Sequence, residues 1–249
     1  MTFGFCGKVS VTDKGCECLK RLSVLLLCLC FLFVPAKASG SEKLIALTFD
    51  DGPSGKYTRR LLDGLEERDA KATFLLCGYR MEQYPELTER IFQEGHEIGL
   101  HGYSHKSMQN MCYNDVTREI RQAMELIPDG CPVSFLRSPG GLCGKCVQVA
   151  AADFGLSVLS WSVDPKDWAT NDAGAIEKAV IRYVQDGDII LLHDMSDSSV
   201  EAAFAIIDEL QAQGFRFVTA SQLAQARNVK LIPGTKYTRF YKADPQQQK

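Results

Sequence analysis

Five short polar clusters recur along the chain, and each follows an apolar run that is typical of a β-strand. They lie at residues 48–53 (TFDDGP), 101–105 (HGYSH), 137–141 (RSPGG), 164–168 (DPKDW) and 191–194 (LLHD). Together they supply two adjacent carboxylates, two neighbouring histidines, an arginine, and a further aspartate and histidine. Metal-assisted hydrolysis needs such groups, because it combines a bound ion with a general base, an orienting cation and a general acid.

Two of the four histidines in the chain, His101 and His105, are four residues apart. In a helical turn both imidazoles would point to one side and could bind one ion. This spacing alone is common at helix surfaces, but the concentration of histidines favours a metal site. His96 stands just ahead of a predicted strand, and we expect it to be structural.

Two adjacent aspartates, Asp50 and Asp51, follow the first predicted strand and precede a Gly-Pro pair. They could simply cap the backbone N–H groups of a turn. A turn can also present both carboxylates to one cavity, where one binds metal and the other takes a proton from water. Arg137 would then orient that base and keep it ionised, rather than form a surface ion pair of little value.

The fourth and fifth clusters offer a second pair of groups, Asp167 and His193. A carboxylate beside a histidine sets the orientation of the ring and favours the imidazolium that a general acid requires. The pair forms only if the fold brings the two strands together. Trp168, next in sequence, could instead be a core aromatic residue.

Apolar runs alternate with amphipathic segments after residue 38. Strands are predicted at residues 44–49, 72–76, 97–100, 133–136, 157–161, 188–192 and 215–219. Helices are predicted at residues 57–68, 85–94, 114–127, 145–154, 173–184 and 200–213. These β/α repeats favour an α/β fold with a parallel sheet, most simply a closed or nearly closed barrel with its chemistry at the carboxyl ends of the strands. An open doubly wound sheet is the alternative, because strand order cannot be read from sequence.

The chain is predicted to have three parts. Residues 1–38 place basic residues ahead of an apolar run at 22–35 and small residues at 36–38, which is typical of a secretory signal peptide. An uncleaved membrane anchor is the alternative, although the run is shorter than the ~20 residues that span a bilayer. Residues 39–227 form the main domain, and residues 228–249 form a polar tail that we expect to be partly disordered. We therefore expect an exported protein, secreted or attached to the cell surface or wall.

Removal of residues 1–38 would leave 23 basic and 29 acidic residues, a net charge of about −6. Such a surface gives no electrostatic reason to bind nucleic acid. We expect a neutral or weakly charged substrate, a monomer, and membrane contact only if the leader is retained.

Five of the ten cysteines lie in the leader. Of the others, Cys77 lies beside an apolar run and is expected to be a buried thiol. The remaining four, Cys112, Cys131, Cys143 and Cys146, favour one or two disulfides in an exported chain, with Cys143 and Cys146 as one candidate pair. A four-thiolate zinc site is the alternative on count alone.

The five clusters resemble the motifs of the polysaccharide deacetylases of carbohydrate esterase family 4, which include peptidoglycan, chitin and acetylxylan deacetylases. The resemblance runs from about residue 43 to residue 223 and covers all five clusters in order. It implies a distorted (β/α)7 barrel of the polysaccharide deacetylase type. It also implies one divalent ion, commonly Zn²⁺, with Co²⁺ or another divalent ion as alternatives.

The resemblance further implies roles for individual residues. Asp51, His101 and His105 would be the metal ligands. Asp50 would be the general base, held by Arg137.

The remaining implied roles concern the acid and the substrate pocket. His193 would be the general acid, tuned by Asp167, while Trp168 and Leu191 would form the walls around the acetyl methyl group. Gly140 stands where many members have an aromatic residue. Its backbone N–H would still serve the oxyanion, but the aromatic wall of the groove would be missing.

The implied substrate is an N-acetylated carbohydrate polymer, with N-acetylglucosamine or N-acetylmuramic acid of peptidoglycan as the first expectation. Chitin oligosaccharides and acetylated xylan are the alternatives in the same class. A catalytically silent carbohydrate-binding domain is the alternative from another class, and it is disfavoured because neither a metal ligand nor the base is missing.

Overall fold

The computed structural model describes residue 7 and residues 42–241. Apart from residue 7, the predicted signal peptide lies outside these residues, as do the last eight residues of the predicted tail. Among the helices that are described, none is long and apolar enough to cross a membrane.

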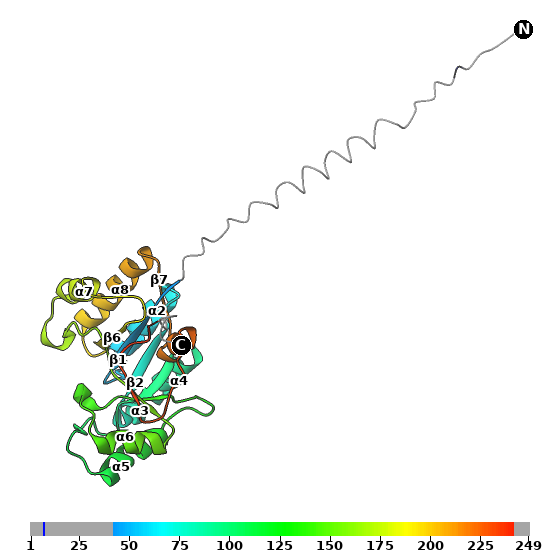
Figure 1. The fold of residues 1–249 in the computed structure, drawn as a ribbon. Coiled ribbons are helices and arrows are strands. Elements are labelled where there is room, and N and C mark those ends of the chain that lie inside the picture. The colour runs from blue at the N-terminus through cyan, green and yellow to red at the C-terminus, as the bar shows by residue number, and fades with distance from the viewer. Residues whose placement is uncertain (1–6, 8–41, 242–249) are drawn as a thin grey trace, which may run out of the picture. The chain divides into compact units, whose positions relative to one another are not determined.

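A parallel sheet forms the centre of the domain (Figure 1). Its strands are β1 (Lys43–Asp50), β2 (Ala72–Leu76), β3 (Glu97–Leu100), β4 (Phe135–Leu136), β5 (Ser157–Leu159), β6 (Ile189–His193), β7 (Phe215–Phe217) and β8 (Lys236–Tyr237). The order is β6-β1-β2-β3-β4-β5-β8, and β7 pairs with β1. Two isolated bridges, Val163 with Ile190 and Asp188 with Arg239, connect the two ends of this path. The sheet is therefore a nearly closed, distorted barrel, as predicted, and not an open doubly wound sheet.

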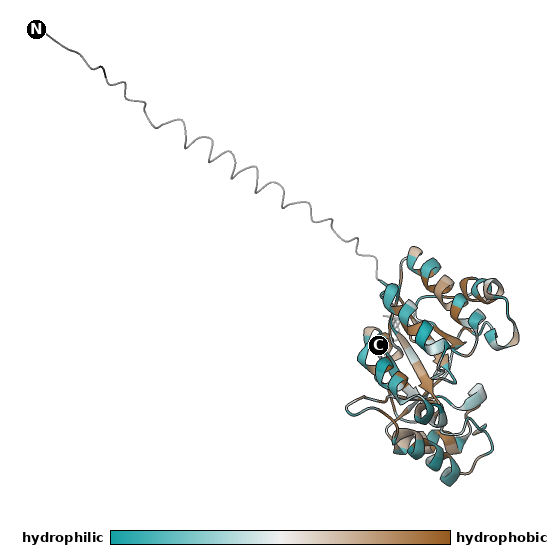
Figure 2. Cartoon of the chain, turned by 180° about the vertical axis from the view of Figure 1, so that it is seen from behind, coloured by the Kyte–Doolittle hydropathy of each residue, from teal (hydrophilic) through white to brown (hydrophobic). Residues whose placement is uncertain are grey.

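Helices cover the outside of the sheet. They are α2 (Tyr57–Glu67), α3 (Gly78–Gln83), α4 (Pro85–Gln93), α5 (Tyr113–Met124), α6 (Lys145–Asp153), α7 (Ala173–Ile181), α8 (Asp197–Ala212) and α9 (Ala220–Ala226), with 3₁₀ turns η1 (Pro139–Gly141) and η2 (Asp167–Ala169). In α2 the helical spacing of Leu61, Leu62 and Leu65 places all three in the core, fully buried. Figure 2 shows the resulting pattern, with hydrophobic strands inside and hydrophilic outer helix faces.

Strand β1 serves both the core and the site. Three of its side chains pack with the outer helices: Ile45, Leu47 and Phe49. The alternate side chains run from apolar to polar along the strand: Leu44, Ala46, Thr48 and Asp50. Because successive side chains of a strand point to opposite faces, the inner face of β1 becomes polar at its carboxyl end. This is where the reactive clusters gather.

The predicted tail is wrong for residues 228–241. Strand β8 pairs with β5, and Phe240 is buried in the second core cluster, where it packs on Tyr237. Its backbone N–H donates to the carbonyl of Gly187 at 2.8 Å. A free edge of β5 is covered in this way, so the domain extends at least to residue 241.

The predicted disulfides are not formed, because all five cysteines of the described residues are free thiols. The Cys112 thiol donates to Asp115 Oδ2 at 3.1 Å. The Cys143 thiol lies 3.9 Å from the carbonyl oxygen of the next residue, Gly144. Cys77 is fully buried, as predicted, and burial raises the pKa of its thiol far above the usual range.

Candidate metal and hydrolytic site

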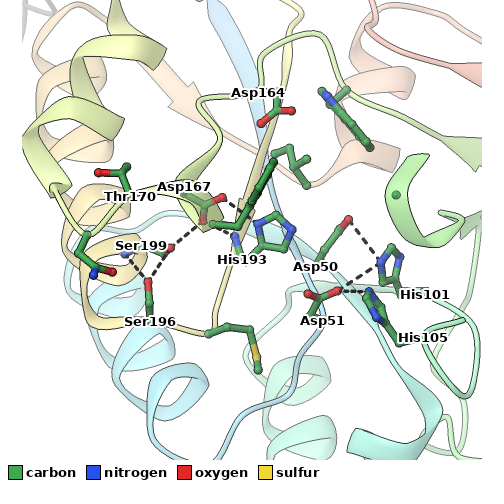
Figure 3. A pocket seen from close by; sticks show the side chains of 16 residues that line it. Asp50, Asp51, His101, His105, Asp164, Asp167, Thr170, His193, Ser196 and Ser199 are labelled. Atoms are coloured by element: carbon green, nitrogen blue, oxygen red, sulfur yellow. Dashed lines mark hydrogen bonds and ion pairs between the residues drawn. The ribbon is translucent and has the colours of Figure 1, made fainter. Parts of the chain in front are cut away.

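Asp51, His101 and His105 converge at the carboxyl ends of β1 and β3 (Figure 3). Asp51 Oδ1 lies 3.3 Å from His101 Nε2 and 2.9 Å from His105 Nε2. One potential ligand atom from each residue lies within 4.8 Å of the others. The structure thus brings together the three residues that the sequence predicted as metal ligands.

The chemistry of these atoms fits a cation. His101 Nδ1 lies 2.8 Å from the carbonyl oxygen of Arg137, which can only accept, so Nδ1 carries the hydrogen. In the neutral ring Nε2 then presents a lone pair toward Asp51 Oδ1, an oxygen that is buried without a hydrogen-bond partner among the described residues. Two electron-rich atoms that face each other without a proton between them need a positive ion. One carboxylate and two imidazoles suit Zn²⁺ and related divalent ions.

The electrostatics agree with this arrangement. Burial acts to raise the pKa of Asp51, but the two imidazoles outweigh it and hold the pKa well below its usual range. Asp51 is therefore ionised and available as a ligand. The same contact with Asp51 raises the pKa of His105.

The two histidines do not share a helical turn, which was the geometry considered for their spacing. Residues 101–105 form an irregular loop, in which Gly102 has φ +77° and His105 has φ +58°. A side chain at position 102 would also be crowded, since its Cβ would lie 2.6 Å from Met108 Cε. The imidazoles therefore converge because the loop reverses, and not because a helix places them on one face.

Asp50 is held by a buried arginine. Arg137 is fully buried, and its Nη1 donates to Asp50 Oδ1 at 2.6 Å and to Thr48 Oγ1 at 2.9 Å. Its other donors reach the carbonyls of Leu159 at 3.2 Å and Ser160 at 3.1 Å. Arg137 is thus no surface ion pair, and it leaves Asp50 Oδ2 free on the side of His101, 3.7 Å from Nε2.

His193 and Asp167 form the second predicted pair. Asp167 Oδ1 accepts from His193 Nδ1 at 2.8 Å, and Oδ2 accepts from the His193 backbone N–H at 2.8 Å and from Ser199 Oγ at 2.7 Å. Burial lowers the pKa of His193, but the bond to Asp167 and its charge outweigh burial and raise the pKa to about 9. His193 is therefore an imidazolium at neutral pH. The contribution of Ser199 was missed, because no sequence cluster includes it.

The cavity over these groups has a volume of about 510 Å³. Nine of the ten predicted site residues line it, and the tenth, Arg137, lies beneath Asp50. Leu191 is a buried wall of the cavity, whereas the side chain of Trp168 is 68% exposed at its edge. Gly140 also lines the cavity, and its φ of +73° suits a residue without Cβ.

An aromatic wall that the sequence did not reveal comes from Trp161. This residue lines the cavity together with Gly140. A Cβ at Gly141 would lie 2.2 Å from the Trp161 ring, so the ring packs directly on that glycine. The guanidinium of Arg137 lies 5.6 Å from the ring centroid. Trp161 is only the last residue of an apolar run in the sequence, and nothing in that run separates it from the core.

Asp194 belongs to the fifth cluster but received no predicted role. It is completely buried and accepts a hydrogen bond from Thr58 Oγ1, and burial raises its pKa to about 7. Its carboxylate lies against Gly52, where a Cβ would approach to 2.6 Å. A glycine is therefore required immediately after Asp51.

Three similarities to known proteins bear on this site. Residues 37–159 match the family described as Polysaccharide deacetylase. The chain is 35% identical over 202 residues to a Bacillus cereus peptidoglycan-N-acetylglucosamine deacetylase, covering 79% of this chain and 95% of that relative. It is 35% identical over 185 residues to the Listeria monocytogenes peptidoglycan-N-acetylglucosamine deacetylase PgdA, covering 74% of this chain but 39% of that relative.

A solved structure is similar as well. It is a family 4 acetyl xylan esterase from Clostridium thermocellum in complex with a cobalt ion. The TM-score is 0.74 at 33% identity, and the match covers 79% of this chain and 98% of that one.

Proposed function

The chain belongs to the polysaccharide deacetylase family, and we propose that it hydrolyses the N-acetyl group of N-acetylglucosamine in peptidoglycan, releases acetate and requires one divalent ion. One observation carries this proposal: three sets of reactive side chains face a single cavity. They are the converged Asp51, His101 and His105, a carboxylate held by a buried arginine, and an imidazole held by a buried carboxylate. Hydrolysis of an amide uses all three.

The first half of the reaction depends on the base. A divalent ion held by Asp51, His101 and His105 would polarise the acetamide carbonyl and make a neighbouring water more acidic. Asp50 takes the proton from that water. Because Arg137 occupies Oδ1, the accepting oxygen is Oδ2. The buried pair with Arg137 holds the Asp50 carboxylate in a fixed orientation.

The second half depends on the oxyanion donor and the acid. The backbone N–H of Gly140 donates to the oxygen that becomes negative as the tetrahedral centre forms. His193 Nδ1–H donates a hydrogen bond to Asp167, which leaves Nε2 to deliver a proton to the departing amine. Leu191 and Trp168 form the walls around the acetyl methyl group.

Zinc is the proposed ion, because one carboxylate and two imidazoles are its usual type of ligand set. The similar acetyl xylan esterase contains cobalt, which makes Co²⁺ the alternative. Identities of 33–35% accompany both a peptidoglycan and a xylan name, so identity does not separate the substrates. Chitin oligosaccharides, acetylated xylan and the N-acetylmuramic acid of peptidoglycan are the alternatives. A silent carbohydrate-binding role is disfavoured, because the proposed metal ligands, base and acid are all present.

Export accompanies this function. Peptidoglycan lies outside the cell membrane, so an enzyme that acts on it must be transported. We assign this role to residues 1–38 as a cleaved signal peptide, and the N-terminal sequence of the protein purified from its native source would test the assignment. A first residue near Ser39 is the expected result.

The substrate can be tested by release of acetate. We expect purified protein with zinc to release acetate faster from N-acetylated peptidoglycan than from chitin oligomers or acetylxylan. The Asp50→Asn variant serves as the control for acetate from contaminating enzymes. Release from acetylxylan alone would overturn the assignment to peptidoglycan, and release from none of the three would overturn the proposed function.

A pH profile can test the acid. His193 is protonated below its pKa of about 9, so acetate release should fall as the pH rises through that value. In Asp167→Asn the group that raises this pKa most is removed, while burial, which lowers it, remains. The alkaline limb of kcat/KM should therefore move to lower pH, toward or below the ordinary value of 6.5.

The matched control for this profile is Asp164→Asn. Asp164 lines the same cavity, but it is exposed and its carboxylate binds the backbone N–H of Lys166 instead of His193. Its removal changes the charge of the cavity equally and should leave the alkaline limb in place. Equal shifts in both variants would show that Asp167 acts only as a distant charge.

A further inference from the structure

Glu119 lies on α5, outside all five sequence clusters, and its carboxylate faces the loop that carries the two histidines. The residue is only 8% exposed. Its Oε2 accepts from the backbone N–H groups of Tyr103 and Ser104, both at 2.8 Å. Its Oε1 accepts from Ser104 Oγ at 2.7 Å. All three donors belong to the segment between His101 and His105.

The opposite side of the same loop is also held. The carbonyls of Gly102 and Tyr103 accept from the backbone N–H groups of Gly78 at 2.9 Å and Tyr79 at 3.0 Å, where α3 begins. The loop is thus bound on one side through its N–H groups by Glu119, and on the other through its carbonyls by α3. These bonds satisfy backbone groups that a strand or helix would otherwise satisfy.

The loop needs such support because its conformation is not intrinsically favoured. His105 has a left-handed backbone at φ +58°, which is uncommon for a residue with a side chain. Its ring is also 42% exposed, so packing alone does not hold it. His101, by contrast, is fastened by its bond to the carbonyl of Arg137. The position of His105 relative to His101 therefore depends on residues 103 and 104.

We propose that Glu119 is a positioning residue for the metal site: it holds residues 103 and 104 so that His105 and His101 converge on Asp51. The carboxylate accepts from both consecutive N–H groups with one oxygen, which fixes the direction of the chain between the two ligands. Some residues orient metal ligands without touching the metal. Mutation of such a residue typically lowers metal affinity by 10–100-fold. This inference rests on the metal site of the proposed function.

The test separates the reach of the side chain from its charge. Glu119→Asp keeps the charge but withdraws the carboxylate from the loop by one methylene. Glu119→Gln keeps the reach, and its carbonyl oxygen can still accept from both backbone N–H groups while its NH₂ donates to Ser104 Oγ. Glu125→Asp, an exposed position at the end of the same helix, is the matched control.

Zinc affinity of each metal-free protein is measured by competition with a chromogenic chelator. We expect Glu119→Asp to bind zinc about tenfold more weakly or worse, and Glu119→Gln and Glu125→Asp to stay within a few-fold of the unsubstituted protein. Acetate release by Glu119→Asp should recover at saturating zinc, because the chemical groups are intact. Circular dichroism melting of the metal-free proteins shows whether each variant is folded.

Three outcomes would count against different claims. Unchanged zinc affinity in folded Glu119→Asp would overturn the role of Glu119 and leave the proposed function standing. Absence of zinc binding by the unsubstituted protein would overturn the proposed metal dependence itself. A tenfold loss in Glu119→Gln beside unchanged affinity in Glu119→Asp would show that charge, and not position, is what Glu119 contributes.

Discussion

Asp50→Asn should lower the rate of acetate release by about 100- to 10,000-fold, while bound zinc stays at the level of the unsubstituted enzyme. The amide keeps the size of the carboxylate and can still accept from Arg137. It cannot take a proton from water, because a neutral amide oxygen is not basic at neutral pH. Zinc content by atomic absorption and acetate release by a coupled assay measure the two effects separately.

Asp51→Asn is the matched comparison, since it makes the same change one residue later. Asp51 is the carboxylate whose Oδ1 faces both imidazoles, so its amide should weaken zinc binding. Its activity should recover in part with excess zinc, whereas that of Asp50→Asn should not. Rescue by zinc of Asp50→Asn alone would reverse the roles of the two aspartates.

Replacement of both His101 and His105 by alanine should abolish stoichiometric zinc binding. Asp51 alone would remain of the proposed ligands, and a single carboxylate holds a transition ion weakly in water. Acetate release should fall by roughly a thousandfold or more, because the ion contributes several kcal/mol to stabilisation of the transition state. Excess zinc should not restore it. Equilibrium dialysis against zinc is the direct measurement.

His96→Ala is the control for the loss of a histidine as such. His96 is buried, its Nδ1 accepts from the backbone N–H of Ala72 at 3.2 Å, and burial lowers its pKa to about 3. Its replacement should reduce thermal stability but retain one zinc ion. Full zinc occupancy in the double variant would contradict the assignment of the ligands, whatever the activity.

Much of the fold could be predicted from local sequence patterns. The predicted bounds of β2 (72–76) and β3 (97–100) agree with the structure, because each short run forms a single strand between a helix and a loop or helix that follows it. The strand β8 and the short helices α3 and α9 were missed. β8 has two residues and exists only because β5 offers an edge to it, so its formation depends on a partner that is distant in sequence.

The candidate site, like the fold, could be predicted from the sequence only in part. The residue types and their order after apolar runs determined that a carboxylate, two imidazoles, a cation and a second imidazole would gather at one end of a barrel, because parallel strands place their carboxyl ends together. The spacing of the two histidines is compatible with a helical turn, but residues 101–105 form a loop. The cysteine count favoured disulfides, which are not formed among the described residues.

Only the tertiary structure decided how these groups are held. Arg137 reaches Asp50 from 87 residues away, Asp167 reaches His193 from 26, and Glu119 reaches Tyr103 from 16. The local sequence pattern indicates the backbone conformation and the burial that each residue favours. It does not indicate which distant donor will bind a buried acceptor. This pairing depends on the packing of strands and helices that meet only when the barrel closes.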